Sequence, residues 1–236
     1  MSVTFDFDGK VVLVTGAAGA LGSAVCEAFT SAGAVTVGAD VLEQDDADSL
    51  LNEEAVADFI QADFTREANA ENAIEDIIET HGRLDVLANV AGTWKGGQPI
   101  EETPVKQFGM LFEINLLTVF LTSKHAIEPL RETGGAIVNV SARSSLSGGA
   151  GDGPYRASKA GVRILTESLA EENLGEVRAN AVMPSVIDTP MNREMMPDAD
   201  HDTWVSPAEI ADVILWLASD GAEVTSGAAV PVYGEA

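Results

Sequence analysis

Hydrophobic and polar positions alternate along this chain with two different periods. Short apolar runs rich in valine, isoleucine and alanine are separated by longer stretches whose apolar positions recur every three or four residues. The short runs are typical of strands buried on both faces, and the longer stretches are typical of amphipathic helices. The pattern predicts strands at 10–15, 34–39, 56–62, 84–90, 135–141, 176–182 and 228–232. It predicts helices at 20–32, 67–81, 104–130, 155–174 and 207–219.

This alternation of strands and helices indicates an α/β fold. We expect one Rossmann-like, doubly wound domain over 1–236, with a parallel seven-stranded sheet and helices on both faces. The chain shows no break in composition and no proline-rich linker that would divide it. Ligands of such sheets bind beyond the carboxyl ends of the strands, so functional residues are expected where the strands stop.

The first predicted strand runs directly into a glycine-rich turn. Residues 11–22 read V-V-L-V-T-G-A-A-G-A-L-G, and an apolar helix pattern follows. In such a turn, one glycine allows the sharp bend, one lets the backbone approach a pyrophosphate, and one lets the helix pack closely on the strand. The amides at the start of the helix would hold the phosphates. We expect contacts with a dinucleotide at Gly16, Ala18, Gly19, Leu21 and Gly22.

The next two strands end in acidic residues. Asp40 follows the second strand, where a carboxylate can accept both hydroxyls of an adenosine ribose and would repel a 2′-phosphate. Neither Ala18 nor Val41 offers the positive charge that such a phosphate needs, which favours NAD over NADP. The alternative is that Asp40 is a solvated loop residue. Asp63 and Phe64 follow the third strand, where they would flank the adenine.

Two further segments combine small and polar residues. The fourth strand runs through Asn89, Ala91 and Gly92, whose small neighbours allow close approach to a cofactor. The loop behind it carries Trp94, which either stacks on a flat substrate or packs on the body of the protein. Asn115 lies among apolar residues of a predicted helix, where it is either a satisfied structural amide or holds a water of a proton relay.

The fifth strand leads to the candidate acid/base chemistry. Tyr155 and Lys159 are four residues apart, so they lie on the same face of a helix. An ammonium near a phenol favours the phenolate and lowers its pKa toward neutrality, which suits proton exchange with a carbonyl–alcohol pair. After the sixth strand, a long loop with Met191, Met195 and Met196 would act as a lid over an apolar pocket, or these methionines are ordinary core residues.

Together these motifs resemble the short-chain dehydrogenase/reductase family over essentially the whole chain. The resemblance rests on the glycine turn, Asp40, Asp63, Asn89-x-Ala91-Gly92, Asn115, Tyr155-x-x-x-Lys159, Pro184 and Thr189. It implies that Tyr155 is the acid/base, that Lys159 lowers its pKa and holds the nicotinamide ribose, and that Asn115 anchors a relay water. It further implies cofactor contacts at Pro184, Ile187 and Thr189. A homotetramer or homodimer built on the helices at 104–130 and 155–174 is also implied.

One departure from the family pattern opens alternatives. The family places a carbonyl-polarising serine about thirteen residues before the tyrosine, and Ala142 stands there. Ser141 or Ser144 would have to replace it, and Ser141 is the first candidate. The Trp94 loop and the segment 187–204 resemble dihydropteridine reductases, which use NADH and lack this serine. The leading expectation is an NAD-dependent alcohol/ketone oxidoreductase. The alternatives are a quinonoid dihydropteridine reductase and a catalytically silent dinucleotide sensor.

The charge of the chain restricts its partners and its surroundings. Acidic residues number 38 against 13 basic ones, a formal net charge of -25. Nucleic acid is therefore not an expected partner, and the dispersed acids predict a salt-adapted, haloarchaeal-type surface. We expect no signal peptide, membrane span or metal site, and a cytoplasmic protein acting on a small molecule. The single cysteine, Cys26, is expected to be a packed, inert thiol.

Overall fold

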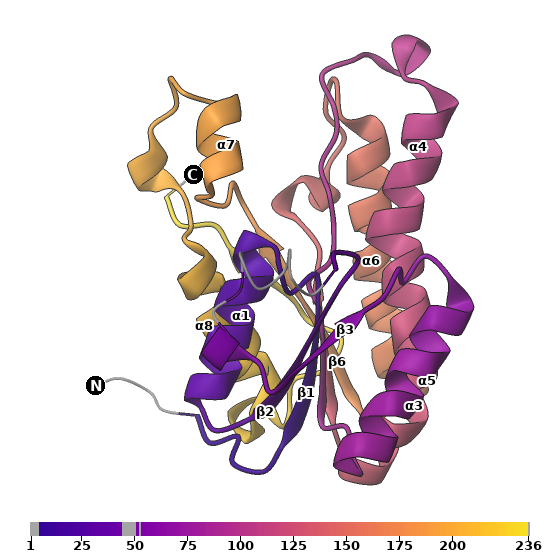
Figure 1. Ribbon diagram of the computed structural model, residues 1–236. Helices are drawn as coiled ribbons and strands as arrows, with labels where there is room; N and C mark the ends of the chain where they lie inside the picture. Colours follow the sequence, from indigo (N-terminus) through magenta and orange to yellow (C-terminus); the bar gives the residue numbers. More distant parts are fainter. Residues whose placement is uncertain (1–4, 44–50, 52, 236) are drawn as a thin grey trace.

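The computed structural model describes residues 5–43, 51 and 53–235, and it contains the predicted seven-stranded parallel sheet (Figure 1). The strand order is β3-β2-β1-β4-β5-β6-β7, and every neighbouring pair is parallel. The order reverses between β1 and β4, where such sheets bind their ligands. The strands are β1 (Val11–Thr15), β2 (Val35–Asp40), β3 (Asp58–Gln61), β4 (Val86–Asn89), β5 (Ala136–Val140), β6 (Arg178–Pro184) and β7 (Ala229–Val232).

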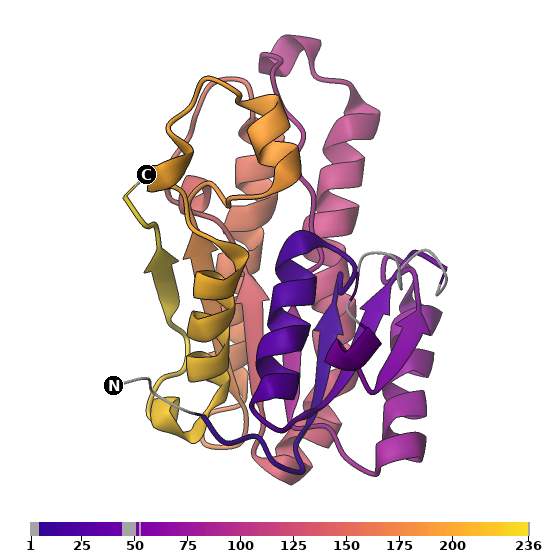
Figure 2. The same ribbon diagram turned by 60° about the vertical axis from the view of Figure 1, so that its left-hand side comes forward.

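Helices cover both faces of this sheet, as the two views in Figures 1 and 2 show. The helices α1 and α8 lie side by side on one face, and α3, α5 and α6 cover the other. The doubly wound α/β fold expected from the sequence is thus confirmed. The helices are α1 (Ala20–Ser31), α3 (Glu67–His81), α4 (Val105–Phe112), α5 (Thr118–Thr133), α6 (Gly153–Glu172), α7 (Pro190–Met195) and α8 (Pro207–Ala218).

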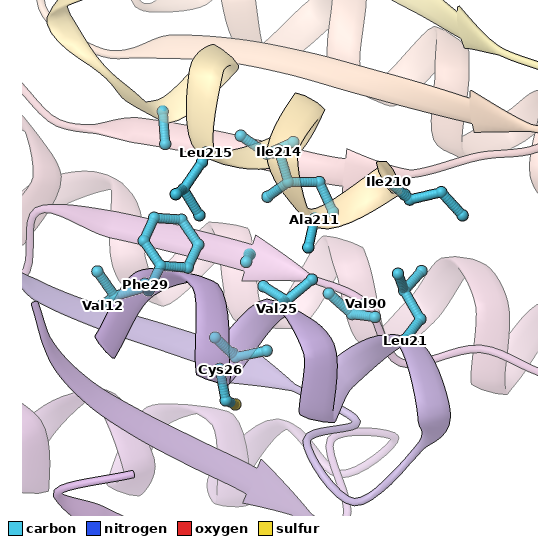
Figure 3. Packing of buried hydrophobic residues seen from close by; sticks show 14 of the residues in the cluster. Val12, Leu21, Val25, Cys26, Phe29, Val90, Ile210, Ala211, Ile214 and Leu215 are labelled. Atoms are coloured by element: carbon cyan, nitrogen blue, oxygen red, sulfur yellow. The ribbon is translucent and has the colours of Figure 1, made fainter. Parts of the chain in front are cut away.

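Successive residues of β1 point into two separate hydrophobic cores. Val12 and Val14 pack toward α1 and α8, whereas Val11 and Leu13 pack on the other side of the sheet. Figure 3 shows the first core, in which residues of α1 face residues of α8. Both faces of β1 are buried, and this explains why its sequence is a continuous apolar run rather than an alternating one.

The long helix expected at 104–130 is not a uniform α-helix. After α4 the backbone makes a π-helical turn over Glu113–Leu117 and then continues as α5. A π turn inserts one residue into the helical ladder, and such turns are frequent at functional sites. Hydrophobic periodicity did not predict this turn, because the pattern on either side of it is helical. The turn contains Asn115.

Two expectations about single features can be compared with the structure. Cys26 is fully buried in the first core, and burial raises the pKa of its thiol to about 12, which fits an inert thiol. Within the described residues, the stretch Val105–Thr133 is long and apolar enough by composition to cross a membrane, although we expected no such segment. In the fold this stretch packs against α3, α6 and the sheet, which accounts for many of its apolar residues.

Candidate active site

A large cavity lies at the carboxyl ends of the strands. Its volume is about 1680 Å³, and its walls come from segments at the ends of β1, β2, β3, β4, β5 and β6. Small-molecule pockets usually measure roughly 300–1,000 Å³. The cavity therefore has room for a ligand of dinucleotide size together with a second small molecule.

The glycine turn forms one end of this cavity. Gly16 has a φ of +68°, and a Cβ there would lie 2.8 Å from the Cα of Ala91. A Cβ on Gly22 would lie 2.0 Å from the carbonyl oxygen of Gly16, so no larger residue fits without a backbone shift. The glycines follow a G-x-x-G-x-x-G spacing, and Gly19 precedes α1 without any side-chain cap. The first amides of α1 are therefore available to an anion.

Asp40 is held at the end of β2 by backbone donors. Its carboxylate accepts hydrogen bonds from the amides of Ala18 (3.1 Å), Val41 (2.8 Å) and Leu42 (3.3 Å). These bonds join the acid to the glycine turn, and both Asp40 and Ala18 line the cavity. The solvated-loop alternative is less consistent with this geometry, because the side chain is half-buried and fixed.

The neighbouring predicted contacts also lie in the cavity wall. Asp63 accepts hydrogen bonds from the amide and hydroxyl of Thr65, and Phe64 beside it is buried. Among the residues expected to hold a cofactor, those lining the cavity are Gly16, Ala18, Gly19, Leu21, Gly22, Asp40, Asp63, Phe64, Ala91, Gly92, Tyr155, Lys159, Pro184, Ile187 and Thr189.

Asn89 is the expected cofactor contact that the cavity does not include. Its side chain is buried and donates to Asn139 Oδ1 (2.9 Å), and it accepts from the hydroxyl of Thr122 (2.7 Å). Asn139 in turn donates to the hydroxyl of Thr166 on α6. Asn89 thus links β4 to β5 and α5 behind the cavity. The motif located the strand end correctly, but it did not show the direction of the side chain.

Tyr155 and Lys159 both line the cavity from α6. The ammonium of Lys159 is buried and donates to the carbonyl oxygen of Val140 at 2.8 Å. Burial lowers the pKa of Lys159 to about 8. Burial and the nearby Asp152 carboxylate raise the pKa of Tyr155 to about 12, and Arg156 opposes this shift. The expected lowering of the phenol pKa by Lys159 is therefore wrong for this structure, because desolvation and Asp152 outweigh the one positive charge that lowers it, Arg156.

Asn115 is buried beside the cavity rather than in its wall. Its amide donates to the carbonyl oxygen of Thr93 (3.0 Å) and to the hydroxyl of Ser158 (3.1 Å), and its oxygen accepts from the amide of Thr93 (2.7 Å). A Cβ on Gly92 would lie 3.2 Å from this oxygen and 2.9 Å from Lys159 Nζ. Asn115 therefore fastens the end of β4 to α6 next to the lysine. The side-chain amide is thus satisfied by protein partners, and the relay water stays a prediction.

The first candidate for the missing serine is already engaged. The hydroxyl of Ser141 donates to the carbonyl oxygen of Lys159 at 2.8 Å, and the residue is buried. Ser141 lines the cavity, but its proton is directed to the backbone of α6. The sequence could not show this commitment, since it depends on where α6 packs against β5.

The loop after β6 covers the cavity. It contains α7, which the sequence pattern did not predict. Thr189 caps the start of this helix, because its hydroxyl oxygen accepts a hydrogen bond from the amide of Asn192. Met191, Met195 and Met196 line the cavity and are exposed, so they are not core residues. Trp94 also lines the cavity and keeps 47% of its surface exposed.

Of the charged residues of the cavity that were not singled out from the sequence, two flank Tyr155 at the start of α6. Asp152 and Arg156 form an ion pair of 2.6 Å, and each lies within one helical turn of Tyr155. Their i, i+4 spacing was the signal that could have revealed them. Among the described residues, no group of three or more histidine, cysteine, aspartate or glutamate side chains could hold a metal ion.

Comparisons with known proteins agree with this architecture. The model of the short chain dehydrogenase family matches residues 10–200. The cyclopentanol dehydrogenase of Comamonas testosteroni is 34% identical, over 95% of this chain and 96% of that protein. The meso-2,3-butanediol dehydrogenase of Serratia marcescens is also 34% identical, over 98% and 95%. The solved aldohexose dehydrogenase of Thermoplasma acidophilum is 28% identical, with a TM-score of 0.88 over 98% and 95%. The chain therefore belongs to the short-chain dehydrogenase/reductase family.

Proposed function

We propose that this protein is an NAD(H)-dependent oxidoreductase that transfers a hydride between nicotinamide and a secondary alcohol or ketone. The observation that carries the proposal is that one cavity is lined both by the glycine turn with Asp40 and by Tyr155 with Lys159. The similar proteins named above are dehydrogenases of a cyclic alcohol, a diol and a sugar, which supports an alcohol or ketone as the substrate.

The residues present fit a dinucleotide. The glycine turn has no room for a Cβ at Gly22, and it presents uncapped amides of α1 to a pyrophosphate. Asp40 offers its carboxylate to ribose hydroxyls and would repel a 2′-phosphate, which supports NAD over NADP. Pro184, Ile187 and Thr189 would border the nicotinamide end, and Lys159 would hold its ribose.

The chemistry at the other end of the cavity concerns one proton. When bound, the nicotinamide supplies or accepts the hydride. In ketone reduction Tyr155 donates its phenolic proton to the substrate oxygen, and in alcohol oxidation its phenolate takes that proton back. The pKa of Tyr155, raised to about 12, keeps the phenol protonated near neutral pH and makes it a weaker acid than an ordinary tyrosine.

The proposal is tested with the full chain in buffers of molar salt. Binding of NADH and NADPH is measured by nucleotide fluorescence. Oxidation of cyclopentanol, meso-2,3-butanediol and an aldohexose with NAD⁺ is followed by NADH absorbance. We expect NADH to bind more tightly and at least one alcohol to be oxidised. Absence of affinity for both dinucleotides would refute the proposal, and binding without turnover of any alcohol or ketone would favour a silent dinucleotide sensor.

Quinonoid dihydropterin reduction is a second candidate, and Trp94 is the observation that favours it. Its half-exposed ring lines the cavity, where it could stack on a flat pterin. The variant Trp94→Ala should then have a KM for a quinonoid dihydropterin at least tenfold higher than the wild type, with unchanged NADH affinity. The absence of any rate with that substrate would eliminate this candidate.

We further infer that the chain forms a homodimer or homotetramer through the π turn, α5 and α6. A groove of about 540 Å³ lies between them, with exposed Phe120 and Ile164 at its walls, and Gly161 lets Leu116 approach α6 closely. Exposed apolar surface of this kind marks an interaction site. Light scattering should give the mass of a dimer or tetramer for the wild type and a smaller species for Ile164→Asp, and a monomeric wild type would contradict this.

The surplus of 25 negative charges supports adaptation to salt. Self-repulsion of so many acids should loosen the fold at low ionic strength, and salt screens it. We expect the melting temperature to rise between low and molar salt. A melting temperature that does not change with salt would argue against this adaptation.

A further inference from the structure

Asp152 stands directly before α6 but does not cap this helix. An aspartate at this position normally accepts a hydrogen bond from one of the free amides of the first turn. The side chain of Asp152 makes no such bond. Its Oδ1 instead accepts from Nε of Arg156 at 2.6 Å, and both residues line the cavity. A carboxylate that leaves its own helix uncapped and lies in a cavity wall calls for an explanation.

The ion pair of Asp152 and Arg156 keeps part of its hydrogen-bonding capacity. Within the described part of the chain, Oδ1 of Asp152 is bonded to Arg156, and no hydrogen bond reaches Oδ2. Arg156 uses Nε for Asp152 and Nη1 for the carbonyl oxygen of Ser147 at 3.3 Å, and Nη2 has no hydrogen bond to these residues. Neither Oδ2 nor Nη2 is among the fully buried atoms without a partner, and the two side chains are 14% and 25% exposed. A small molecule in the cavity can therefore reach both groups.

The loops around this ion pair hold it in place. Arg156 packs closely against Gly149, where a Cβ would lie 2.3 Å from the Cζ of the arginine. The amide of Gly97 donates to the carbonyl oxygen of Gly151 at 2.8 Å, which joins this loop to the segment that carries Trp94. Groups that are fixed before a ligand arrives lose less entropy on binding, so the pair is prepared to bind.

The charges of the pair favour a neutral ligand that carries a hydroxyl group. The carboxylate would repel an anion, and the guanidinium would repel a cation. A hydroxyl can donate to Oδ2 of Asp152 and accept from Arg156, and hydrogen bonds to charged groups are stronger than neutral ones. Tyr155, the proposed proton donor, lies between the two residues in the sequence of the first turn and lines the same cavity. The charges of both residues act on its phenol. A hydroxyl bound by the pair would thus lie near the reacting oxygen.

We propose that Asp152 and Arg156 form a subsite for a second hydroxyl group of the substrate, on the carbon next to the one that is oxidised. The inference rests on the proposed function and names its substrate class, vicinal diols and the corresponding α-hydroxy ketones. In oxidation, the carbon that bears the first hydroxyl gives a hydride to oxidised nicotinamide, and the O–H proton goes to the phenolate of Tyr155 as the C=O bond forms. The second hydroxyl keeps its covalent bonds and only makes hydrogen bonds to the pair.

Matched substrates test this subsite in the full chain, with NAD⁺ in molar salt. meso-2,3-Butanediol and 2-butanol share one carbon chain, and cis-1,2-cyclopentanediol and cyclopentanol share one ring, so each pair differs only by the second hydroxyl. We expect the wild type to favour each diol at least about 100-fold in kcat/KM, because a site built to bind a hydroxyl discriminates against an analogue that lacks it. A preference below about threefold in both pairs, with measurable turnover, would overturn the subsite and leave the proposed function intact.

The variant Asp152→Asn keeps the shape of the side chain and removes its charge. The diol preference should fall at least about tenfold, mainly through a higher KM for the diols, because a charged acceptor is lost. Any change in the proton affinity of Tyr155 acts on both substrates of a pair and cancels in this ratio. If the pair only anchored the loop, the variant would lose stability and keep its diol preference, and this result would overturn the subsite.

Glu167→Gln is the matched control. Glu167 and Arg163 form an ion pair that also has a spacing of four residues and a distance of 2.6 Å on α6, but neither residue lines the cavity. The diol preference of this variant should stay within about threefold of the wild type. An equal fall in both variants would trace the effect to overall charge and overturn the subsite. A wild type without a rate on any alcohol or ketone would overturn the proposed function itself.

Discussion

The two ends of the cavity are built in different ways. The cofactor end, formed by β1, α1 and β2, consists of backbone atoms, glycines and one carboxylate tied to three amides. The reaction end, formed by β5 and α6, depends on polar side chains that compete for partners. Backbone geometry follows directly from residue type and spacing, whereas side-chain pairing depends on how distant elements pack. The first end was therefore readable from the sequence and the second only in part.

The largest expected effect lies at the reaction end. Replacing Tyr155→Phe removes the proton that the substrate oxygen needs and leaves the ring in place. We expect kcat to fall about 10³-fold or more, in the upper range for general acid–base catalysis. The dissociation constant of NADH, measured by fluorescence, should remain close to that of the wild type. Turnover retained in this variant would show that the two ends of the cavity do not divide binding from chemistry.

At the cofactor end, the sharpest test compares two glycines of one turn. In Gly22→Ala the new Cβ would lie 2.0 Å from the carbonyl oxygen of Gly16, whereas in Gly19→Ala it would lie 3.3 Å from the same atom. The first requires a backbone shift, and we expect it to cost at least about 3 kcal/mol in the free energy of unfolding. The second requires a shift of a few tenths of an ångström and should cost less than about 1 kcal/mol. Denaturant titration measures both, and equal losses would contradict the role assigned to close packing at Gly22.

Particular residues show how far sequence reasoning reached. The parallel seven-stranded sheet, the glycine turn and the place of Asp40 follow from apolar runs and from residues at strand ends. Asn89 was assigned to the right strand end, but a strand directs successive side chains to opposite faces, and its own direction depended on partners in β5 and α5. The π turn around Asn115 and the bond from Ser141 to Lys159 arise from packing between elements, which no local pattern encodes.

The buried lysine at the reaction end should make stability depend on pH. Burial lowers the pKa of Lys159 from 10.5 to about 8, so between these values the unfolded chain binds the proton and the folded chain does not. The free energy of unfolding must therefore rise with pH in this window. The pKa of Tyr155 is raised to about 12, so this phenol makes the free energy of unfolding fall with pH, but only above about pH 10.

Urea titrations of the wild type and of Lys159→Met at pH 8 and pH 10 isolate this contribution. The stability of the wild type relative to the variant should increase by about 2 kcal/mol between the two pH values. This is less than the whole pKa shift of Lys159 would give, because the measurement covers only part of the titration range. A relative stability that is constant with pH would mean that the lysine keeps its proton in the folded state. The reaction end would then resemble the cofactor end, with its charges fixed rather than adjustable.

The smallest expected effect concerns the choice of dinucleotide at the cofactor end. Asp40→Ser removes the negative charge that would face a 2′-phosphate, and it also removes the acceptor of three backbone amides. We expect the ratio of NADPH to NADH affinity to rise about tenfold, or about 1.4 kcal/mol, a modest change because molar salt screens the repulsion. Glu79→Gln, an exposed acid on α3 outside the cavity, changes the net charge equally and should leave the ratio as it is. If the affinity ratio changed equally in both variants, the preference for NADH would come from the overall negative charge of the protein. Asp40 would then have no specific role in the choice of dinucleotide.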